Sequence, residues 1–370
     1  MARIGIDATS VSTHGKGVSR YQRNIVQSLS RLESNHEYYV FLNEAYRISP
    51  FVQEPNWHFV SVKIWKEILW EQIEIPRWIR RLALDLFHVT TDRIPYFSKG
   101  PFLLQLFEVP DHRVRFVQKA PSRYSLYKRM AEVSRLVFFP SSVGRAARIL
   151  VSSKNTQKEL TDKYHMDPQK MRVVPLSHET TFRPETDSRT VSETRKNLGA
   201  PAGYILHFST QDPRENTEAV LAAFEKAKNQ IERNIKLLII GIEEKKKRKD
   251  VIYKGYLDER ELVRIYQAAL AYVDPSFYEG FALQILEAIA CGVPVVASRR
   301  SSIPELVGDA GILIDPEDAE AIAHAMTRIL MDDNLWREIR QKGLERAKLF
   351  SWEKTARQTL SAYEEILNER

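Results

Sequence analysis

The sequence has a single cysteine, Cys291, which excludes an internal disulfide and a cysteine-cluster metal site. Its apolar neighbours predict a buried small side chain rather than a reactive thiol. No run of about 18 apolar residues occurs, so no membrane-spanning helix is expected. The start, MARIGIDATS, has one arginine before a short strand-like run and does not resemble a secretory signal. We therefore expect a cytoplasmic protein whose contact with a membrane, if any, is peripheral and on the inner face.

Positive charge is concentrated in the first half of the chain. Residues 1–185 hold 28 Lys and Arg against 18 Asp and Glu, a net charge of +10, whereas the remainder holds 27 against 30, a net charge of −3. Residues 113–148 alone contain nine basic side chains and one acidic one, Glu132, with aromatic residues between them. Two interpretations stay open: contact with anionic lipid or a phosphorylated acceptor, or a solvated helix face. We expect no nucleic-acid partner, because the positive charge is the sole feature of the sequence that would support one.

The 370 residues exceed what one hydrophobic core usually supports, so two domains are expected. Short β-branched or aromatic runs alternate with longer segments of helical period, which is typical of parallel sheets with crossover helices. The first such unit is a strand over 3–7, a loop over 13–17 and a helix from Val18. The alternation lapses over 184–203, which we interpret as the interdomain connection. The sequence therefore predicts an α/β fold with two Rossmann-like domains.

One segment of the second half, 275–297, combines a strand end, a turn and a helix start. It is PSFYEGFALQILEAIACGVPVVA, in which a helix is predicted to begin near Ala282 and to end at Gly292. The first turn of a helix exposes backbone N–H groups and carries about half an elementary positive charge, so a diphosphate can bind there. Glu279 lies directly before this position.

The second glutamate of the segment, Glu287, lies about one and a half turns inside the predicted helix. At that depth its carboxylate can accept hydrogen bonds from two vicinal hydroxyls, such as those of a ribose. Its neighbours in sequence are apolar, and a carboxylate in such company is costly unless a partner hydrogen-bonds to it. This favours a binding role over a surface charge.

The two glutamates form an E-x7-E pattern, and together with PSFYEGFALQILEAIACGVPVVAS they resemble the retaining glycosyltransferases of the GT-B fold, usually called family 4. The resemblance extends along most of the chain, through 15–20, 70–72, 87–88, 173–175, 254–258, 303–310 and 350–353. It implies a GT-B fold, in which two Rossmann-like domains face each other across a cleft. The implied parts are an acceptor-binding domain over 1–183, a nucleotide-sugar-binding domain over 184–350, and a last helix over 351–370 that returns to the first domain.

The resemblance also implies a reaction. A hexose, which we expect to be mannosyl or glucosyl, passes from a GDP- or UDP-sugar to a hydroxyl of a glycan or lipid-linked saccharide with retention of configuration. No metal and no cofactor are expected, because basic side chains and backbone N–H groups neutralise the leaving diphosphate. Glu279 and Arg214 would be the catalytic residues, contacting the donor sugar and the phosphates, and Glu287 would hold the ribose. The other implied donor contacts are Gly17, Gly280, Phe281, Ala282, Leu283, Gln284, Tyr256 and Leu257.

Two positions depart from the family pattern. Glu215 stands where the family commonly has a lysine, so either Arg214 acts alone with the helix start or a cation such as Lys16 or Arg20 substitutes. Phe107 stands where the family often has a histidine followed by aspartate. The polar contact would then come from Glu108, Asp111 or His112, or the acceptor side would work differently. His88 is expected to be a structural histidine.

Two other functions stay open. Loss of turnover, suggested by Glu215 and Phe107, would leave a donor-binding scaffold subunit. A sugar-nucleotide epimerase or phosphorylase would keep the fold and change the reaction, since a fold does not fix its chemistry. Such relatives lack the E-x7-E helix, and nucleotide release from a sugar donor with and without acceptor distinguishes the possibilities.

Overall fold

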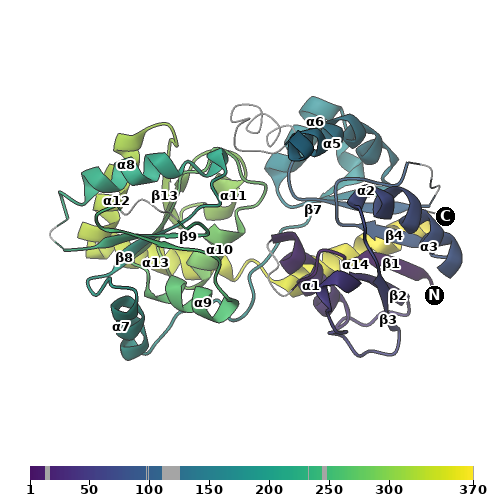
Figure 1. The fold of residues 1–370 in the computed structure, drawn as a ribbon, viewed down its shortest axis with the longest axis horizontal. Helices are drawn as coiled ribbons and strands as arrows, with labels where there is room; N and C mark the ends of the chain where they lie inside the picture. The colour runs from purple at the N-terminus through teal and green to yellow at the C-terminus, as the bar shows by residue number, and fades with distance from the viewer. Residues whose placement is uncertain are drawn as a thin grey trace. The chain divides into compact units, whose positions relative to one another are not determined.

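A computed structural model describes residues 1–12, 17–96, 98, 100–110, 126–231, 233–243 and 248–369. The chain forms two compact units (Figure 1). Unit 1 consists of Met1–Leu176 together with Ser351–Arg370, and unit 2 of Ser177–Phe350. Within the described residues, no helix combines the length and the apolarity needed to cross a bilayer.

The sheet of unit 1 has seven parallel strands in the order β3-β2-β1-β4-β5-β6-β7. The strands are β1 (Arg3–Asp7), β2 (Glu37–Asn43), β3 (Trp57–Val62), β4 (Leu86–Val89), β5 (Phe102–Leu106), β6 (Arg148–Val151) and β7 (Met171–Val173). The helices described are α1 (Gly17–Leu29), α2 (Glu67–Leu69), α3 (Ile75–Leu82), α5 (Leu126–Arg145), α6 (Lys154–Tyr164) and α14 (Trp352–Asn368), with a π-helical turn Trp70–Glu74 between α2 and α3. The strand order changes direction between β1 and β4.

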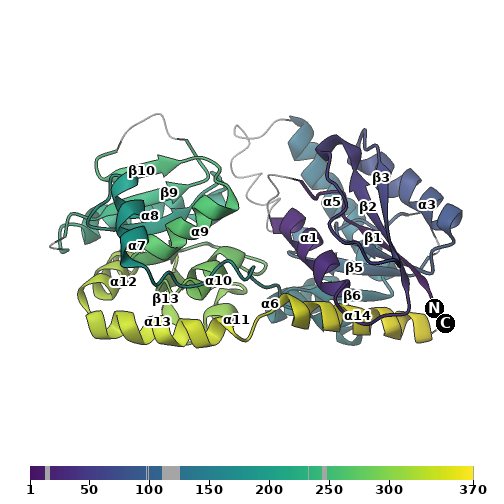
Figure 2. The same cartoon turned by 90° about the horizontal axis from the view of Figure 1, so that it is seen from below.

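Both faces of this sheet are covered at its centre, where all residues of β1, β4 and β5 except Arg3 are buried. Successive side chains of β4 point to opposite faces of the sheet and contact the helices on each side. Phe87 and Val89 pack into a core shared with α5 and α6, whereas His88 lies on the opposite face, where its Nδ1 is 2.8 Å from the hydroxyl of Tyr363 in α14. Helix α14 lies beside α1 on that face (Figures 1 and 2). The last helix of the chain is thus part of the core of unit 1.

Unit 2 repeats this architecture with six parallel strands in the order β10-β9-β8-β11-β12-β13. The strands are β8 (Tyr204–Phe208), β9 (Lys236–Ile240), β10 (Val251–Lys254), β11 (Ala271–Asp274), β12 (Val295–Ser298) and β13 (Gly311–Ile314). The helices described are α7 (Ser188–Asn197), α8 (Thr217–Ala227), α9 (Glu259–Ala268), α10 (Leu283–Ala290), α11 (Ile303–Val307), α12 (Ala319–Met331) and α13 (Asp333–Ala347). Helices α8 and α12 pack together over one face of the sheet, and α9 and α10 lie on the other (Figure 1). The strand order changes direction between β8 and β11.

The border between the units differs from the prediction. It lies between Leu176 and Ser177 rather than after residue 183. The intervening segment packs on unit 2, because the Phe182 ring is buried against Tyr266 in α9, and the Arg183 carbonyl accepts a hydrogen bond of 2.8 Å from Gln267.

The interpretation of 184–203 as a plain connection is also wrong, because it contains helix α7. Asp187 caps this helix by accepting from Arg189 N at 2.9 Å, and Arg195 donates from Nε to the Ala268 carbonyl at 2.8 Å. The helix is polar on most sides and packs on α9, so its sequence lacks the apolar stripe that would have revealed it.

Candidate functional site

The loops that follow β8 and β11 meet at the carboxyl end of the sheet of unit 2. Phe277 N donates to the Arg214 carbonyl at 2.8 Å, and Asn216 Nδ2 donates to the Pro275 carbonyl at 3.3 Å. These two strands flank the position where the strand order reverses. In open α/β sheets, ligands bind at such a position.

The Glu279 backbone is held on both sides by serines that follow β12. Glu279 N donates to Ser301 Oγ at 2.9 Å, and Ser302 Oγ donates to the Glu279 carbonyl at 2.8 Å. Ser302 is buried, while Glu279 is half-buried. The two serines therefore fix the position from which the Glu279 side chain starts.

Helix α10 begins one residue later than predicted, at Leu283. Ala282 occupies the N-cap position with φ 66° and ψ 56°, in the left-handed region, and provides no side-chain cap. Helices α9 and α12 of the same unit are capped by Asp258 and Asp318. A left-handed non-glycine residue costs about 1–3 kcal/mol and is found where surrounding structure or function requires it. The start of α10 is therefore a place where a ligand can take the role of the cap.

The carboxyl group of Glu287 is enclosed in unit 2, where the side chain is 1% exposed. The Tyr266 hydroxyl donates to Glu287 Oε2 at 2.9 Å. Tyr272 lies close to both predicted carboxylates: burial raises its pKa well above the usual value, and Asp274, Glu279 and Glu287 raise it further. The structure thus brings Glu279, Glu287 and the Arg214 loop to one end of the sheet.

The remaining predicted donor contacts of unit 2 lie in two places. Phe281 is 8% exposed at the start of α10, and the nearby positions Gly280, Leu283 and Gln284 range from buried to exposed. Tyr256 is 55% exposed, with Leu257 half-buried beside it, in the loop between β10 and α9. The contacts of these residues with a donor stay predictions.

The Glu215 position has a structural role. Its carboxylate accepts hydrogen bonds from Thr210 N and Thr210 Oγ1, both at 2.6 Å, and from Asp212 N at 3.2 Å, which closes the loop after β8 as a capping box. The Arg214 guanidinium is 2.9 Å from Asp212 Oδ2. The Glu215 carboxylate therefore orders the Arg214 loop. It does not supply the positive charge that a lysine at this position would offer to a phosphate.

Several predicted contributors belong to unit 1 or lie outside the described residues. Gly17 begins α1, and a Cβ added there would meet no atom of the described residues within 4 Å, so packing within that part of the chain does not require glycine. Lys16, Asp111 and His112 lie outside the described residues, as does the part of the basic stretch from 113 to 125.

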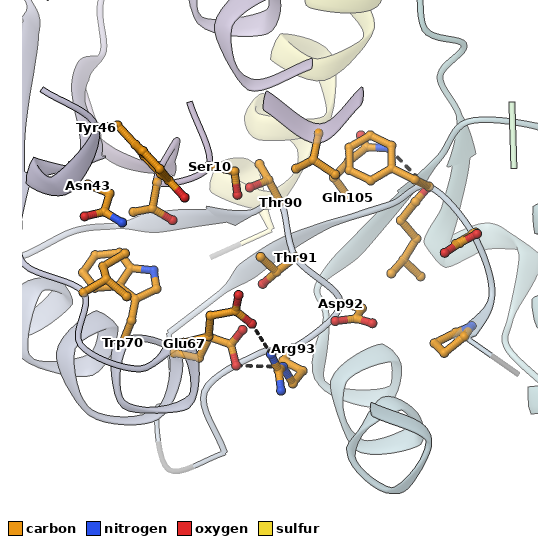
Figure 3. A pocket seen from close by; sticks show the side chains of 18 residues that line it. Ser10, Asn43, Tyr46, Glu67, Trp70, Thr90, Thr91, Asp92, Arg93 and Gln105 are labelled. Carbon is orange, nitrogen blue, oxygen red and sulfur yellow. Dashed lines mark hydrogen bonds and ion pairs between the residues drawn. The ribbon is translucent and has the colours of Figure 1, made fainter. Parts of the chain in front are cut away.

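Sequence reasoning missed a polar pocket of about 280 Å³ in unit 1 (Figure 3). It lies at the carboxyl ends of β1, β4 and β5, where the strand order of that sheet reverses, and Trp70 and Glu71 of the π-helical turn line it. Phe107, which departs from the family pattern, lines it together with Glu108. Its members come from segments far apart in sequence, so no local motif marks them.

Two charged side chains that line this pocket, Arg93 and Glu71, are buried. Arg93 Nε is 2.8 Å from Glu71 Oε2, and Arg93 Nη2 is 3.4 Å from Glu67 Oε2. Burial raises the pKa of Glu71 to about 8, against the lowering effect of Arg93. Burial also raises the pKa of Asp7, and Thr9 opposes that rise by hydrogen bonding.

His88 belongs to β4 and has a structural role on the face of the sheet that α14 covers. It is fully buried, its Nδ1 pairs with Tyr363, and burial lowers its pKa to about 3, so it stays neutral. Among the residues whose structure is described, no three His, Cys, Asp or Glu side chains are placed to hold a metal ion.

Family models match both halves of the chain. The model described as Glycosyl transferases group 1 matches residues 191–346, and the model described as Glycosyltransferase Family 4 matches residues 15–181. MMP alpha-(1->4)-mannosyltransferase of Mycolicibacterium hassiacum is 30% identical over 314 residues, which cover 78% of this chain and 72% of that protein.

Other relatives match part of their length. O-antigen chain mannosyltransferase B of Escherichia coli is 33% identical over 69% of this chain and 65% of that protein. For Serotype-specific mannosyltransferase WbdA of Escherichia coli the match is 26% identical and spans 33% of the protein. The chain thus spans about a third to two thirds of the length of these two relatives.

Two solved structures share the fold along the whole chain. Sucrose-phosphate synthase from Thermosynechococcus elongatus superposes with a TM-score of 0.77 at 21% identity, covering 100% of both chains. HepE of Anabaena, in complex with UDP-glucose, superposes with a TM-score of 0.73 at 14% identity over 99% of this chain and 100% of that one. At such identities the likeness establishes the fold, which is GT-B.

Proposed function

The chain belongs to the group 1, or family 4, glycosyltransferases, and on this premise we propose that it transfers a sugar from a nucleotide diphosphate to a hydroxyl group of an acceptor. The observation that supports this most is the end of the sheet in unit 2, where Glu279, Arg214 and the uncapped start of α10 meet. This end offers a carboxylate, a guanidinium and backbone N–H groups to a sugar diphosphate.

We assign the roles within unit 2 as follows. Glu279 contacts the donor sugar, and Arg214 with the first turn of α10 contacts the diphosphate. Glu287 accepts from the ribose hydroxyls, oriented by the hydroxyl of Tyr266. The exposed Tyr256 loop lies beside the base. Gly17 lets the backbone of unit 1 approach the diphosphate.

The proposed reaction retains the anomeric configuration. The bond between the anomeric carbon and the diphosphate oxygen breaks, and the acceptor oxygen bonds to the same face of the carbon. The diphosphate leaves with the bonding electron pair, and the acceptor proton passes to it. Arg214 and the helix start stabilise the developing negative charge.

We propose a hexose as the transferred sugar, with mannose the first choice and glucose the second. Names of relatives support this choice: three are mannosyltransferases, and one solved structure of the same fold holds UDP-glucose. The acceptor is proposed to be a glycan or a lipid-linked saccharide. The N-terminal unit binds it.

A screen of GDP- and UDP-sugars tests this function. The matched donor at a hundred times its dissociation constant should stabilise the protein by about 2.7 kcal/mol, seen as a raised Tm. The same donor should release nucleotide faster when a glycan acceptor is added. If no nucleotide sugar raises the Tm and none is turned over, the proposal fails.

A second candidate function is a donor-binding subunit without turnover, which the phenylalanine at position 107 favours. In that case calorimetry would show donor binding, while neither hydrolysis nor transfer would occur with any acceptor. Calorimetry and a turnover assay on the same protein preparation therefore distinguish the two functions.

The proposed membrane contact uses the basic stretch 113–148. Of this stretch the backbone is described from Leu126 and the side chains from residue 136, where Val137 and Phe138 are exposed. Vesicles containing phosphatidylserine should sediment the protein at low salt, whereas neutral phosphatidylcholine vesicles should not. Equal partition onto both would contradict the contact.

A further inference from the structure

The loops that follow β8, β9 and β10 are joined at the carboxyl end of the sheet of unit 2. Ser209 N donates to the Ile240 carbonyl and Gly241 N to the Lys254 carbonyl, both at 2.8 Å. Gly241 has a φ of 104°, and a Cβ built there would lie 2.5 Å from the Ser209 carbonyl oxygen, so the close approach requires glycine. The loops after β9 and β10 therefore continue, strand by strand, the edge on which the Arg214 loop lies.

One carboxyl group lies on this part of the edge. Glu243 comes three residues after the end of β9, and its side chain is exposed. A Cβ built on Gly255, the first residue after β10, would lie 2.9 Å from Glu243 Oε1 and 3.3 Å from Glu243 Cγ. The lack of a side chain at position 255 thus lets the Glu243 carboxyl group lie against the backbone of the β10 loop. The next residue of that loop is Tyr256, which is 55% exposed.

These two side chains offer different contacts to a nucleotide base. An aromatic ring such as that of Tyr256 can stack on any base, because every base has a π-face, so stacking alone does not select one base. An ionised carboxylate such as that of Glu243 accepts hydrogen bonds through two oxygens and donates none. The carboxylate therefore selects a base by the donors on the base edge.

Guanine has the edge that matches two carboxylate oxygens. Its N1–H and its N2 amino group are neighbouring donors, so one carboxylate can accept from both, and such charge-assisted, two-bond pairs are the strong ones. Uracil has a single N–H, which lies between two carbonyl oxygens. A carboxylate that faces this edge meets an acceptor beside the donor, and repulsion of this kind is how a site rejects the wrong partner.

We propose that Glu243 is a specificity-determining residue that accepts from N1–H and the N2 amino group of guanine, so that the donor of this chain is a GDP-sugar rather than a UDP-sugar. The choice of base rests on the proposed function, in which the base of the donor lies beside the Tyr256 loop. It adds a residue after β9 to the donor site and names the nucleotide.

The test is calorimetry of the full chain with free GDP, IDP and UDP. IDP keeps the N1–H of guanine and lacks the N2 amino group, so it separates the two expected hydrogen bonds. Glu243→Gln keeps the size of the side chain and removes its charge. Glu259→Gln is the matched control, because Glu259 is also exposed, follows the same β10 loop, and accepts from Thr181 Oγ1 at 3.0 Å instead.

We expect GDP to bind at least about tenfold more tightly than UDP, equivalent to about 1.4 kcal/mol, with IDP between them. Glu243→Gln should weaken GDP about tenfold and leave UDP unchanged, whereas Glu259→Gln should change neither. The proposal is overturned if UDP binds as tightly as GDP, if Glu243→Gln weakens GDP and UDP equally, or if the control weakens GDP as much.

Turnover separates this proposal from the proposed function. Preference for GDP that depends on Glu243, without transfer from any nucleotide sugar, would support the choice of base and count against the transferase function. Transfer from UDP-sugars and not from GDP-sugars would support the transferase function and overturn the choice of base. If none of the three nucleotides binds, both proposals fail.

Discussion

At the residue scale, Glu287 shows how a carboxyl group can be buried and still be available for binding. It is 1% exposed, and Tyr266 occupies one of its oxygens. Glu287→Gln keeps the shape and the contact with Tyr266 but removes the charge that a ribose hydroxyl would meet. Because hydrogen bonds to charged groups contribute about 1.5–3 kcal/mol, we expect nucleotide affinity to fall about tenfold to a hundredfold in calorimetry. Unchanged affinity would remove the ribose assignment.

Glu71 makes stability depend on pH. Its pKa is about 8 in the folded protein and near 4.5 when unfolded, so the folded state holds an extra proton between these values. The free energy of unfolding should therefore fall as the pH rises through this window, by up to about 1.4 kcal/mol for each pH unit. The groups facing Glu71 are Arg93, which opposes the rise in pKa, and Asp92, Glu67 and Asp7, which add to it.

Glu71→Gln should remove this dependence, because glutamine does not titrate. Urea unfolding of both proteins at pH 5.5 and pH 9 checks the expectation. The free energy of unfolding of the variant minus that of the natural chain should be more positive at pH 9 than at pH 5.5. A difference in free energy that is the same at both pH values would show that Glu71 does not titrate in this window.

At the element scale, helix α10 begins from a left-handed alanine. Ala282→Gly should relieve the strain of the left-handed backbone and leave the Tm equal or higher. In the middle of a helix, by contrast, glycine usually lowers stability by about 0.5–1 kcal/mol relative to alanine. Ala290→Gly at the last residue of the same helix is the matched control and should lower the Tm. If both variants lose the same stability, the left-handed start carries no strain.

The serine contacts that hold the Glu279 backbone give a second prediction at this scale. Ser302→Ala removes the donor to the Glu279 carbonyl, so the Glu279 side chain starts from a less fixed position. We expect kcat to fall about tenfold while nucleotide affinity stays unchanged, and Ser302→Thr to recover part of the loss. Ser298→Ala is the control, because Ser298 is equally buried and its Oγ accepts from Arg300 N instead. A raised KM with unchanged kcat would argue against positioning.

Elements with a strong apolar period were predictable from the sequence, and the polar ones were not. The strand at 3–7 matches the expected position, and its central residues Ile4 to Ile6 are buried on both faces. Helix α7 was missed, since its residues are polar and its position depends on contacts with α9. The turn around Glu279 could be predicted because its residues are contiguous.

The pocket of unit 1 could not be predicted in the same way. Its polar residues lie at the ends of four different strands and in the helical segment from Glu67 to Glu71, and only the order of the strands brings them together. The structural role of Glu215 was hidden for a similar reason. Its departure from the family pattern suggested a lost phosphate contact, whereas its three hydrogen bonds show a cap.

At the scale of the whole molecule, the division into two units predicts that a nucleotide stabilises them unequally. Five of the six tryptophans belong to unit 1, and Trp336 alone belongs to unit 2. Free GDP or UDP at a hundred times its dissociation constant should stabilise the calorimetric transition of unit 2 by about 2.7 kcal/mol. The transition seen by tryptophan fluorescence should shift less. If the two transitions shift together, the nucleotide is not held chiefly by unit 2.

The central claim is that the turn before α10 binds the sugar of a nucleotide-sugar donor through Glu279. The most direct measurement compares transfer and nucleotide binding in Glu279→Gln with the matched variant Glu338→Gln, whose carboxylate is exposed on α13 of the same unit. Loss of one group that stabilises transition-state charge costs about a hundredfold to a thousandfold in kcat. We predict such a loss of kcat for Glu279→Gln, with nucleotide affinity preserved. For Glu338→Gln we predict that both kcat and nucleotide affinity stay unchanged. Transfer at the natural rate in Glu279→Gln would contradict the account.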